Sequence, residues 1–175
     1  LSSLNSHILI TGEKGTGKRL VADTLRACSP RKGKPVVEIN CAELPEPILE
    51  AQLLGGVEDG DDAPVLEGKL AFHAAEGGVL ILDEIGMLSP DIQIRLLKVL
   101  REKTLSGPAT DSSGRPIDVR VMGLCTVGAS APGDGLVKEF AAYIGALKLE
   151  LKPLRDRPEE ILPLVTHFLA RNVKK

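Results

Sequence analysis

One glycine-rich segment limits what this chain can fold into more than any other feature: Gly12-Glu13-Lys14-Gly15-Thr16-Gly17-Lys18. It fits the pattern G-x-x-x-x-G-K, directly after an apolar run and directly before a helical pattern. Glycines let successive backbone N–H groups curl around a phosphate, while Lys18 reaches the terminal phosphates and the helix adds its positive end. A glycine-rich turn with a chance lysine is the alternative, but the flanks favour a strand–loop–helix unit. The segment therefore predicts that residues 12–18 bind the phosphates of a nucleotide.

Short apolar runs alternate with helical patterns along the rest of the chain. We expect strands at residues 7–11, 35–40, 79–83, 119–125 and 147–151. Several are apolar without a break, which is typical of a parallel sheet covered on both faces. We expect helices at residues 18–28, 45–54, 69–75 and 91–101, and a final one from 158 to about 173. This alternation predicts an α/β fold, a three-layer sandwich with a mostly parallel five-stranded sheet.

Some boundaries and interruptions of this pattern are also predictable. Ser89 can cap the helix expected at residues 91–101, Pro90 suits its first turn, and Asp91 faces the positive end of its dipole. Residues 55–68 hold a Gly-Gly pair and a run of acids, and we expect a mobile acidic loop there. Residues 106–116 are rich in Ser, Gly and Pro and also predict a loop.

A second candidate site is an apolar strand that ends in two acids, Val79-Leu80-Ile81-Leu82-Asp83-Glu84. Carboxylates at the end of a buried strand are costly unless they meet a cation or a water. We expect Asp83 to hold Mg²⁺, usually through water, and Glu84 to polarise the attacking water. A strand that simply ends in a solvated acidic turn is the alternative. Together with the phosphate-binding loop, this strand predicts binding of ATP with Mg²⁺.

The composition argues against several other classes of protein. The net charge of -2 and the pI of about 6.0 do not fit a domain that grips DNA phosphates directly. Aromatic residues make up only 2%, which argues against a stacking platform for single-stranded nucleic acid. Cys28, Cys41 and Cys125 form no zinc or disulfide pattern and fit reduced thiols in the cytosol. Since no apolar run is long enough to cross a membrane, we expect a cytoplasmic protein without membrane contact.

Several segments, in chain order, resemble the central AAA+ domain of bacterial enhancer-binding proteins, which remodel sigma-54 RNA polymerase at promoters. They are residues 9–18, Ile39-Asn40-Cys41-Ala42 with Leu44-Pro45-Glu46, residues 82–86, residues 118–121 and Pro153-Leu154-Arg155-Asp156-Arg157. The resemblance covers nearly the whole chain, and the combination is specific. It implies a nucleotide-binding core at residues 1–157 and the start of a truncated helical lid at residues 158–175. Because the chain opens at Leu1 without Met, we expect a fragment of a longer protein.

The resemblance also implies roles and partners. Asn40 matches the family's switch, which holds the catalytic Glu84 until the γ-phosphate is sensed; an Asn in a strand-end turn is the alternative. The partners implied are further copies of the chain, through AAA+ subunit contacts, and an RNA polymerase sigma factor. DNA would be bound through a domain outside these residues.

The chain departs from the family pattern at four places. Residues 60–65 align with a loop of sequence GAFTGA that contacts sigma-54, but they lack its Phe-Thr pair and add two acids. Thr126 stands where the family has a sensor Asn; it can still hydrogen-bond a phosphate or water, with a shorter reach and one donor, and we count it with the catalytic residues Glu84 and Asn40. Val137 and Tyr143 stand where the family has arginine fingers, which are worth roughly 10³ to 10⁵ in rate. Arg19 stands next to Lys18 where a hydroxyl would bind the metal directly, and we count it with the nucleotide-binding residues.

These departures favour a divergent regulator that uses nucleotide for binding or assembly and whose ATPase is slow or impaired. The alternative is an active ATPase that remodels sigma-54 RNA polymerase to drive open-complex formation. An unrelated AAA+ remodeller, such as a helicase loader, would not explain the segments around Asn40 and Arg155.

Overall fold

The computed structural model describes residues 5–55, 70–105, 115–127 and 135–172. The strands in this part of the chain are β1 (Ile8–Gly12), β2 (Val36–Asn40), β3 (Val79–Asp83), β4 (Thr104–Leu105), β5 (Arg115–Pro116), β6 (Arg120–Thr126) and β7 (Lys148–Leu151). The helices are α1 (Lys18–Ala27), α2 (Glu46–Leu54), α3 (Ala71–Ala74), α4 (Pro90–Glu102), α5 (Lys138–Ile144) and α6 (Ile161–Asn172). Short 3₁₀ turns form η1 (Ile85–Met87), η2 (Leu154–Asp156) and η3 (Pro158–Glu160).

Five of the strands form one parallel sheet in the order β2-β3-β6-β1-β7. This confirms the predicted α/β fold, and each predicted strand lies within one residue of an observed one. All four pairings are parallel, so the carboxyl ends of the five strands meet along one edge. Loops that follow these strands therefore gather at that edge, where ligands bind in open α/β sheets.

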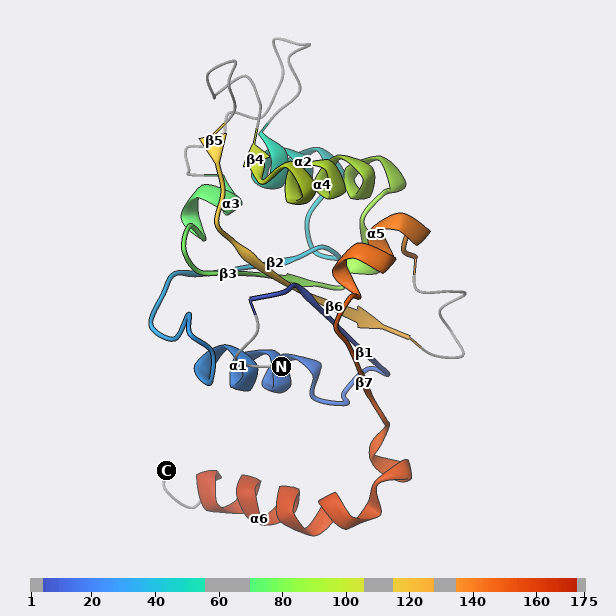
Figure 1. Ribbon diagram of the computed structural model, residues 1–175. Coiled ribbons are helices and arrows are strands. Elements are labelled where there is room, and N and C mark those ends of the chain that lie inside the picture. Colours follow the sequence, from blue (N-terminus) through green and yellow to red (C-terminus); the bar gives the residue numbers. More distant parts are fainter. Residues whose placement is uncertain (1–4, 56–69, 106–114, 128–134, 173–175) are drawn as a thin grey trace.

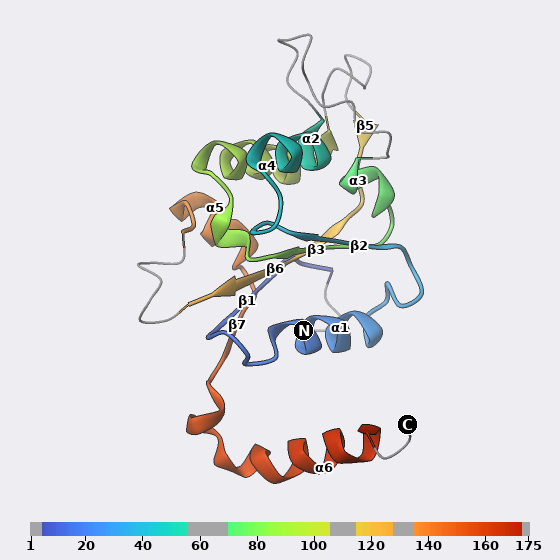
Figure 2. The same ribbon diagram turned by 180° about the vertical axis from the view of Figure 1, so that it is seen from behind.

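The sheet is the middle of three layers (Figure 1). One face carries α1, and the other carries α2, α3, α4 and α5, an arrangement that the reverse view repeats (Figure 2). Successive residues of a strand alternate between the two faces. Ile8 and Ile10 pack with Ala22 of α1, whereas Leu9 belongs to the larger core beneath the other four helices. The central strands β1 and β3 are apolar up to their last residues because both faces of the sheet are covered there.

The helix α6 lies beyond α1, on the side of α1 away from the sheet (Figures 1 and 2). Several of its apolar side chains are exposed: Ile161, Leu162, Val165, Phe168 and Leu169. Among the described residues, no helix combines the length and the apolar character needed to cross a membrane.

Several local predictions need correction. The helix expected at residues 69–75 is only four residues long within the described part, as α3. Arg115–Pro116, expected inside a loop, pairs antiparallel with Thr104–Leu105. The final helix starts as a 3₁₀ turn, and α5 was not anticipated. The predicted cap of α4 is confirmed, since Ser89 accepts a hydrogen bond from the Ile92 N–H at 3.5 Å. The loop predicted at residues 55–68, the stretch 60–65 within it and residues 106–114 lie outside the described residues, apart from Gly55.

Candidate functional site

Three neighbouring strands bring the candidate site residues together. β3, β6 and β1 lie side by side, and they end at Asp83, Thr126 and Gly12 respectively. Gly12 and Thr126 are register partners. The phosphate-binding loop after β1 and the acids after β3 therefore meet across the end of β6. Residues distant in sequence thus share one short stretch of the sheet edge.

The backbone of the phosphate-binding loop depends on its glycines. A Cβ at Gly12 would lie 2.7 Å from the carbonyl oxygen of Leu151 and 2.8 Å from Oγ1 of Thr16, too close for any side chain. Gly15 and Gly17 have φ angles of 84° and 92°, in the left-handed region that glycine adopts without strain. Gly17 precedes α1, whose first turn has no side-chain cap in the structure. The backbone N–H groups at the start of α1 are therefore suited to bind an anion.

The side chain of Lys18 is buried beneath this loop. Its Nζ donates to the carbonyl oxygens of Gly12 and Glu13, at 3.0 Å and 3.2 Å, and to Oγ1 of Thr126 at 2.9 Å. The loop carbonyls thus fix the ammonium group inside the curl of the backbone. A phosphate held by the loop would meet a positioned cation.

The two acids after β3 have different partners. Oδ1 of Asp83 accepts a hydrogen bond from the backbone N–H of Glu84 at 2.9 Å. Glu84 has a φ of 50°, which is uncommon for a residue other than glycine. Both of its carboxylate oxygens bond to Thr126: Oε1 accepts from the hydroxyl at 2.5 Å and Oε2 from the backbone N–H at 3.3 Å. Thr126 therefore contacts both Lys18 and the candidate base.

Asn40 ends β2, beside Asp83 in the register of the sheet. Its amide group donates to Oε1 of Glu43 at 2.7 Å, and its carbonyl oxygen accepts from the N–H of Ala42 at 3.0 Å. Within the described residues, the structure therefore joins Asn40 to its own turn and not to Glu84. The bond two residues onward is the Asx-turn that Asn commonly forms.

Arg19 points away from the phosphate-binding loop. Its guanidinium bonds to Asp23 at 3.2 Å and also pairs with Glu38. The hydroxyl of Thr16 donates a hydrogen bond to the carbonyl oxygen of Glu13 at 2.8 Å. Among the described residues, no three His, Cys, Asp or Glu side chains group as a metal site. A metal here would take one carboxylate, from Asp83, with phosphate oxygens and water as the other ligands, which suits Mg²⁺.

Two arginines from the far end of the chain contact the phosphate-binding loop. Both terminal nitrogens of Arg155 bond to the carboxylate of Glu13, and Arg157 donates to the carbonyl oxygen of Thr16 at 2.8 Å. The sequence placed these arginines in a turn but gave no sign that they would reach a loop about 140 residues earlier.

Gln93 of α4 is a buried polar residue that the sequence did not single out. Its Nε2 donates to the carbonyl oxygens of Leu88 and Gly135, each at 2.8 Å, and its Oε1 accepts from the N–H of Val137 at 2.7 Å. Leu88 follows the turn η1 after Glu84, and Val137 begins α5. One side chain thus ties the segment behind the candidate base to α5.

The segment aligned with the arginine fingers forms the start and body of α5. Val137 is its N-cap residue, and the hydroxyl of Tyr143 donates to the carbonyl oxygen of Leu100 at 2.9 Å. Tyr143 is half-buried and lies against the ring of His7, with 5.6 Å between ring centres. Its side chain therefore packs within its own subunit.

A comparison with known families decides which family this is. A model described as "Sigma-54 interaction domain" matches residues 1–130. This chain belongs to that family. It is a domain of the sigma-54 activator type found in bacterial transcriptional regulators, as its resemblance predicted.

Relatives of this sigma-54 interaction domain are much longer proteins. It is 42% identical over 165 residues to the sigma54-dependent transcriptional regulator SfnR of Pseudomonas fluorescens, covering 93% of this chain and 44% of SfnR. It is 36% identical to the Nif-specific regulatory protein of Azospirillum brasilense, covering 99% of this chain and 28% of the relative. It is 38% identical to the regulatory protein TyrR of Salmonella typhimurium, covering 98% and 32%. The chain thus spans less than half of each relative.

Solved structures agree with the fold. NtrX from Brucella abortus in complex with ADP superposes with a TM-score of 0.80 at 27% identity, covering 98% of this chain and 37% of NtrX. The NtrX complex with ATP gives a TM-score of 0.78 at 27% identity, covering 97% and 37%. The P-loop NTPase domain of a sigma-54 transport activator from E. coli, 18% identical with a TM-score of 0.54 over 87% of each chain, shares the fold.

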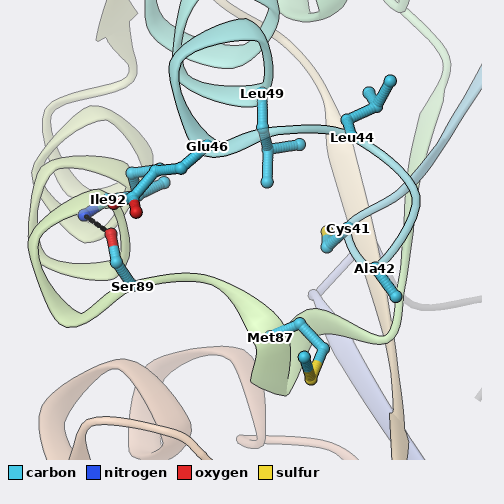
Figure 3. A pocket seen from close by; sticks show the side chains of 8 residues that line it. All are labelled: Cys41, Ala42, Leu44, Glu46, Leu49, Met87, Ser89 and Ile92. Carbon is cyan, nitrogen blue, oxygen red and sulfur yellow. Dashed lines mark hydrogen bonds between the residues drawn. The ribbon is translucent and has the colours of Figure 1, made fainter.

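A small pocket of this sigma-54 interaction domain lies between the turn after β2, the start of α2 and the segment that runs from η1 into α4 (Figure 3). Its volume is about 260 Å³, and it is lined by Cys41, Ala42, Leu44, Glu46, Leu49, Met87, Ser89 and Ile92. Burial raises the pKa of the Cys41 thiol to about 12, and the negative charges of Asp83 and Glu84 act in the same direction. Cys41 is therefore a protonated thiol that lines an apolar wall, and it is not a nucleophile.

Proposed function

We propose that this sigma-54 interaction domain binds ATP with Mg²⁺ and uses the nucleotide chiefly for binding or assembly within a bacterial transcriptional regulator. The single observation that carries the proposal is the position of Lys18. Its buried ammonium group is held by the carbonyl oxygens of Gly12 and Glu13 in a loop with the backbone of a phosphate site. The printed titles of the NtrX structures, complexes with ADP and ATP, support the same ligand class.

In this proposal each residue has a separate task. The N–H groups of residues 12–18 surround the phosphates, and Lys18 neutralises the terminal ones. Asp83 would hold Mg²⁺, usually through water, and the metal would supply charge neutralisation on the phosphates. Glu84 orients the attacking water once its carboxylate is free to accept the proton. Arg19 pairs with Asp23 and Glu38 and takes no part in metal binding.

Hydrolysis is proposed to be slow because neither finger position, Val137 nor Tyr143, holds an arginine. Val137 is apolar, and the hydroxyl of Tyr143 donates to the carbonyl oxygen of Leu100 in the same subunit. Charge that grows on the γ-phosphate would lack the arginine that normally stabilises it. The further proposed partners are copies of the same chain, a sigma factor, and DNA through a domain outside these residues. We also propose that residues 1–157 form the nucleotide-binding core and that residues 158–175 begin a lid.

Calorimetry on the full-length protein tests the nucleotide proposal. Lys18→Ala should weaken ATP binding by about 10- to 100-fold, because it removes a charge-assisted bond to phosphate. The folding transition should stay cooperative, and the exposed Lys32→Ala should bind like the wild type. Equal affinity of wild type and Lys18→Ala would contradict the proposal.

The alternative function, an active ATPase that remodels sigma-54 RNA polymerase, can be tested separately. Residues 60–65 are acidic and lack the Phe-Thr pair, so we expect no stable complex with sigma-54 in the presence of an ATP transition-state mimic. Co-migration of the two proteins on a native gel under those conditions would favour the alternative.

A further inference from the structure

A second cavity lies at the edge of the sheet opposite the phosphate-binding loop. It has a volume of about 590 Å³, and we call it the amino-edge pocket. His7 comes directly before β1, and Asp118 and Val119 come directly before β6, so the pocket lies where these parallel strands begin. Gly12 and Thr126 end the same two strands. A strand rises about 3.3 Å per residue, so roughly 15 Å separates the two edges.

One wall of the amino-edge pocket is aromatic and apolar. The rings of His7 and Tyr143 lie 5.6 Å apart between their centres, and both line the pocket. Leu100, Ile117 and Ala142 add apolar surface around them. Burial is the main reason why the pKa of His7 falls to about 4, so this ring is uncharged at neutral pH. The wall is therefore suited to pack against an apolar ring of a ligand.

Two cations, Arg31 and Lys103, line the same pocket. The guanidinium of Arg31 is held in place, because it donates to two backbone carbonyl oxygens at 3.0 Å and 3.1 Å and to the carboxylate of Asp118 at 2.5 Å. Lys103 is exposed, and within the part of the chain that the structure describes its ammonium group has no hydrogen-bond or ion-pair partner. One cation is thus fixed in position, and the other is available to a ligand.

The charges around the amino-edge pocket do not cancel. Asp118 is the only acid among the described residues that line it, whereas Arg120, buried at the start of β6, adds a third positive charge close by. All three cations act with burial to lower the pKa of His7, which shows that their charges reach the aromatic wall. The ends of α4 and α5 bring partial negative charges of only about half a unit each. The pocket therefore keeps a net positive charge beside an apolar wall.

We propose that the amino-edge pocket binds a small organic anion, a carboxylate or phosphate carried on an apolar ring. The ring lies against Tyr143 and His7, and the oxyanion lies between Arg31 and Lys103. A guanidinium that is already held in place loses little freedom when it bonds an oxyanion, and its planar fork matches both carboxylate and phosphate. Since this site is on the opposite edge from Lys18, the proposal does not depend on nucleotide binding.

Calorimetry on the full-length protein with naphthalene compounds tests the chemistry of the site. Naphthoate and naphthyl phosphate carry both a ring and an anion, naphthol carries the ring alone, and acetate and inorganic phosphate carry the charge alone. At least one of the two ring anions should bind at least about tenfold more tightly than naphthol and than its own ringless anion. The tighter of the two ring anions identifies carboxylate or phosphate as the preferred group. Saturating ADP should leave this binding unchanged.

Variants locate the binding in the amino-edge pocket. Lys103 has a φ of 52°, so Lys103→Asn removes the charge with a residue that tolerates the left-handed backbone. It should weaken binding of the ring anion about threefold to tenfold and leave naphthol unaffected. Lys98→Asn removes the same charge from an exposed position of α4 outside this pocket and should change neither. Ala142→Trp fills the pocket from an exposed position of α5 and should weaken binding at least about tenfold without a change in charge.

Thermal denaturation checks that each variant still unfolds cooperatively. Equal affinity for naphthol and for both ring anions would overturn the proposal, and so would unchanged binding in the folded Lys103→Asn and Ala142→Trp variants. Displacement of the ring anion by ADP would place it at the phosphate-binding loop and would also overturn the proposal. A wild type that binds ADP but neither ring anion would contradict this site alone and leave the proposed function intact.

Discussion

The carboxylate of Glu13, inside the phosphate-binding loop, lies 2.5 Å and 2.8 Å from the two terminal nitrogens of Arg155. The hydrogen bonds from Arg155 lower the pKa of Glu13 and raise that of the arginine. The pair is exposed to solvent, so its effect on stability is small. Its position matters more, because an unpaired carboxylate at residue 13 would repel the phosphates bound by the same loop.

Loss of Arg155 should therefore weaken nucleotide binding through Glu13. We expect Arg155→Ala to lower ATP affinity roughly threefold to tenfold at low ionic strength, and less at high salt, because exposed charges are screened. In a Glu13→Gln background the same change should have little effect. Calorimetry at two salt concentrations measures this, and an equal loss in both backgrounds would mean that Arg155 acts on the nucleotide directly.

Gln93 should be important for stability because all its polar atoms are bonded and buried. Gln93→Met keeps the length of the side chain but leaves the Leu88 and Gly135 carbonyls and the Val137 N–H without their partner. We expect the free energy of unfolding to fall by about 3 kcal/mol. Urea denaturation measures this change, with Gln52→Met on the half-exposed side of α2 as the matched control. A loss no larger than that of the control would contradict the role given to Gln93.

His7 should make the domain sensitive to mild acid. Burial, together with the positive charges of Arg120, Lys103 and Arg31, lowers the pKa of His7 to about 4. Nδ1 of the imidazole accepts a hydrogen bond from the Val121 N–H at 3.0 Å. The ring also lines a pocket of about 590 Å³. Unfolding exposes this histidine, whose pKa then returns to about 6.5.

Between pH 6.5 and 4 the unfolded chain therefore binds a proton at His7 that the folded chain does not. Stability should fall as the pH falls through this window, by up to roughly 3 kcal/mol from this residue. His7→Asn retains an acceptor for the Val121 N–H but does not titrate. This variant should therefore lose less stability between pH 7 and pH 4.5 than the wild type does. Parallel denaturation curves at both pH values decide this, and identical losses in the two proteins would contradict the assignment.

ATP turnover in the full-length protein should depend little on protein concentration, since assembly adds no finger. Val137→Arg together with Tyr143→Arg should raise the rate at least roughly tenfold and make it concentration-dependent. Glu139→Arg, which adds an arginine at an exposed position of α5, should do neither. The double variant also loses the bond from Tyr143 to Leu100, so it should melt at a lower temperature. A steep concentration dependence in the unmodified protein would mean that another arginine supplies the charge.

The sheet was predictable because its central strands β1, β3 and β6 are buried on both faces and are therefore mostly apolar. Even the edge strand β2 was found, although Val36 and Glu38 are exposed. The pairing of β4 and β5 could not be found, because two residues in each strand are too few to show an alternating side-chain pattern. The helix α5 escaped notice since Phe140 and Ile144 alone form its buried stripe, too short a repeat to indicate a helix.

The part of the candidate site that lies within short sequence motifs was predictable. Gly12 to Lys18 and Asp83 to Glu84 could be located because the spacing of each motif reflects local backbone geometry. The bonds among Lys18, Thr126 and Glu84 could not, because they depend on which strands are neighbours in the sheet. For Asn40 a local signal did exist: an Asn followed two residues later by a free N–H favours a turn of its own.

The bonds made by Gln93 have a mechanical consequence. Since the one amide of Gln93 bonds both to Leu88, after the turn that follows Glu84, and to Val137, the N-cap residue of α5, these two segments cannot shift independently without breaking a hydrogen bond of Gln93. If a change at Glu84 displaced the turn that follows it, α5 would therefore move with that turn. The helix α5, which packs on one face of the sheet, is thereby linked to the edge where the phosphates would lie.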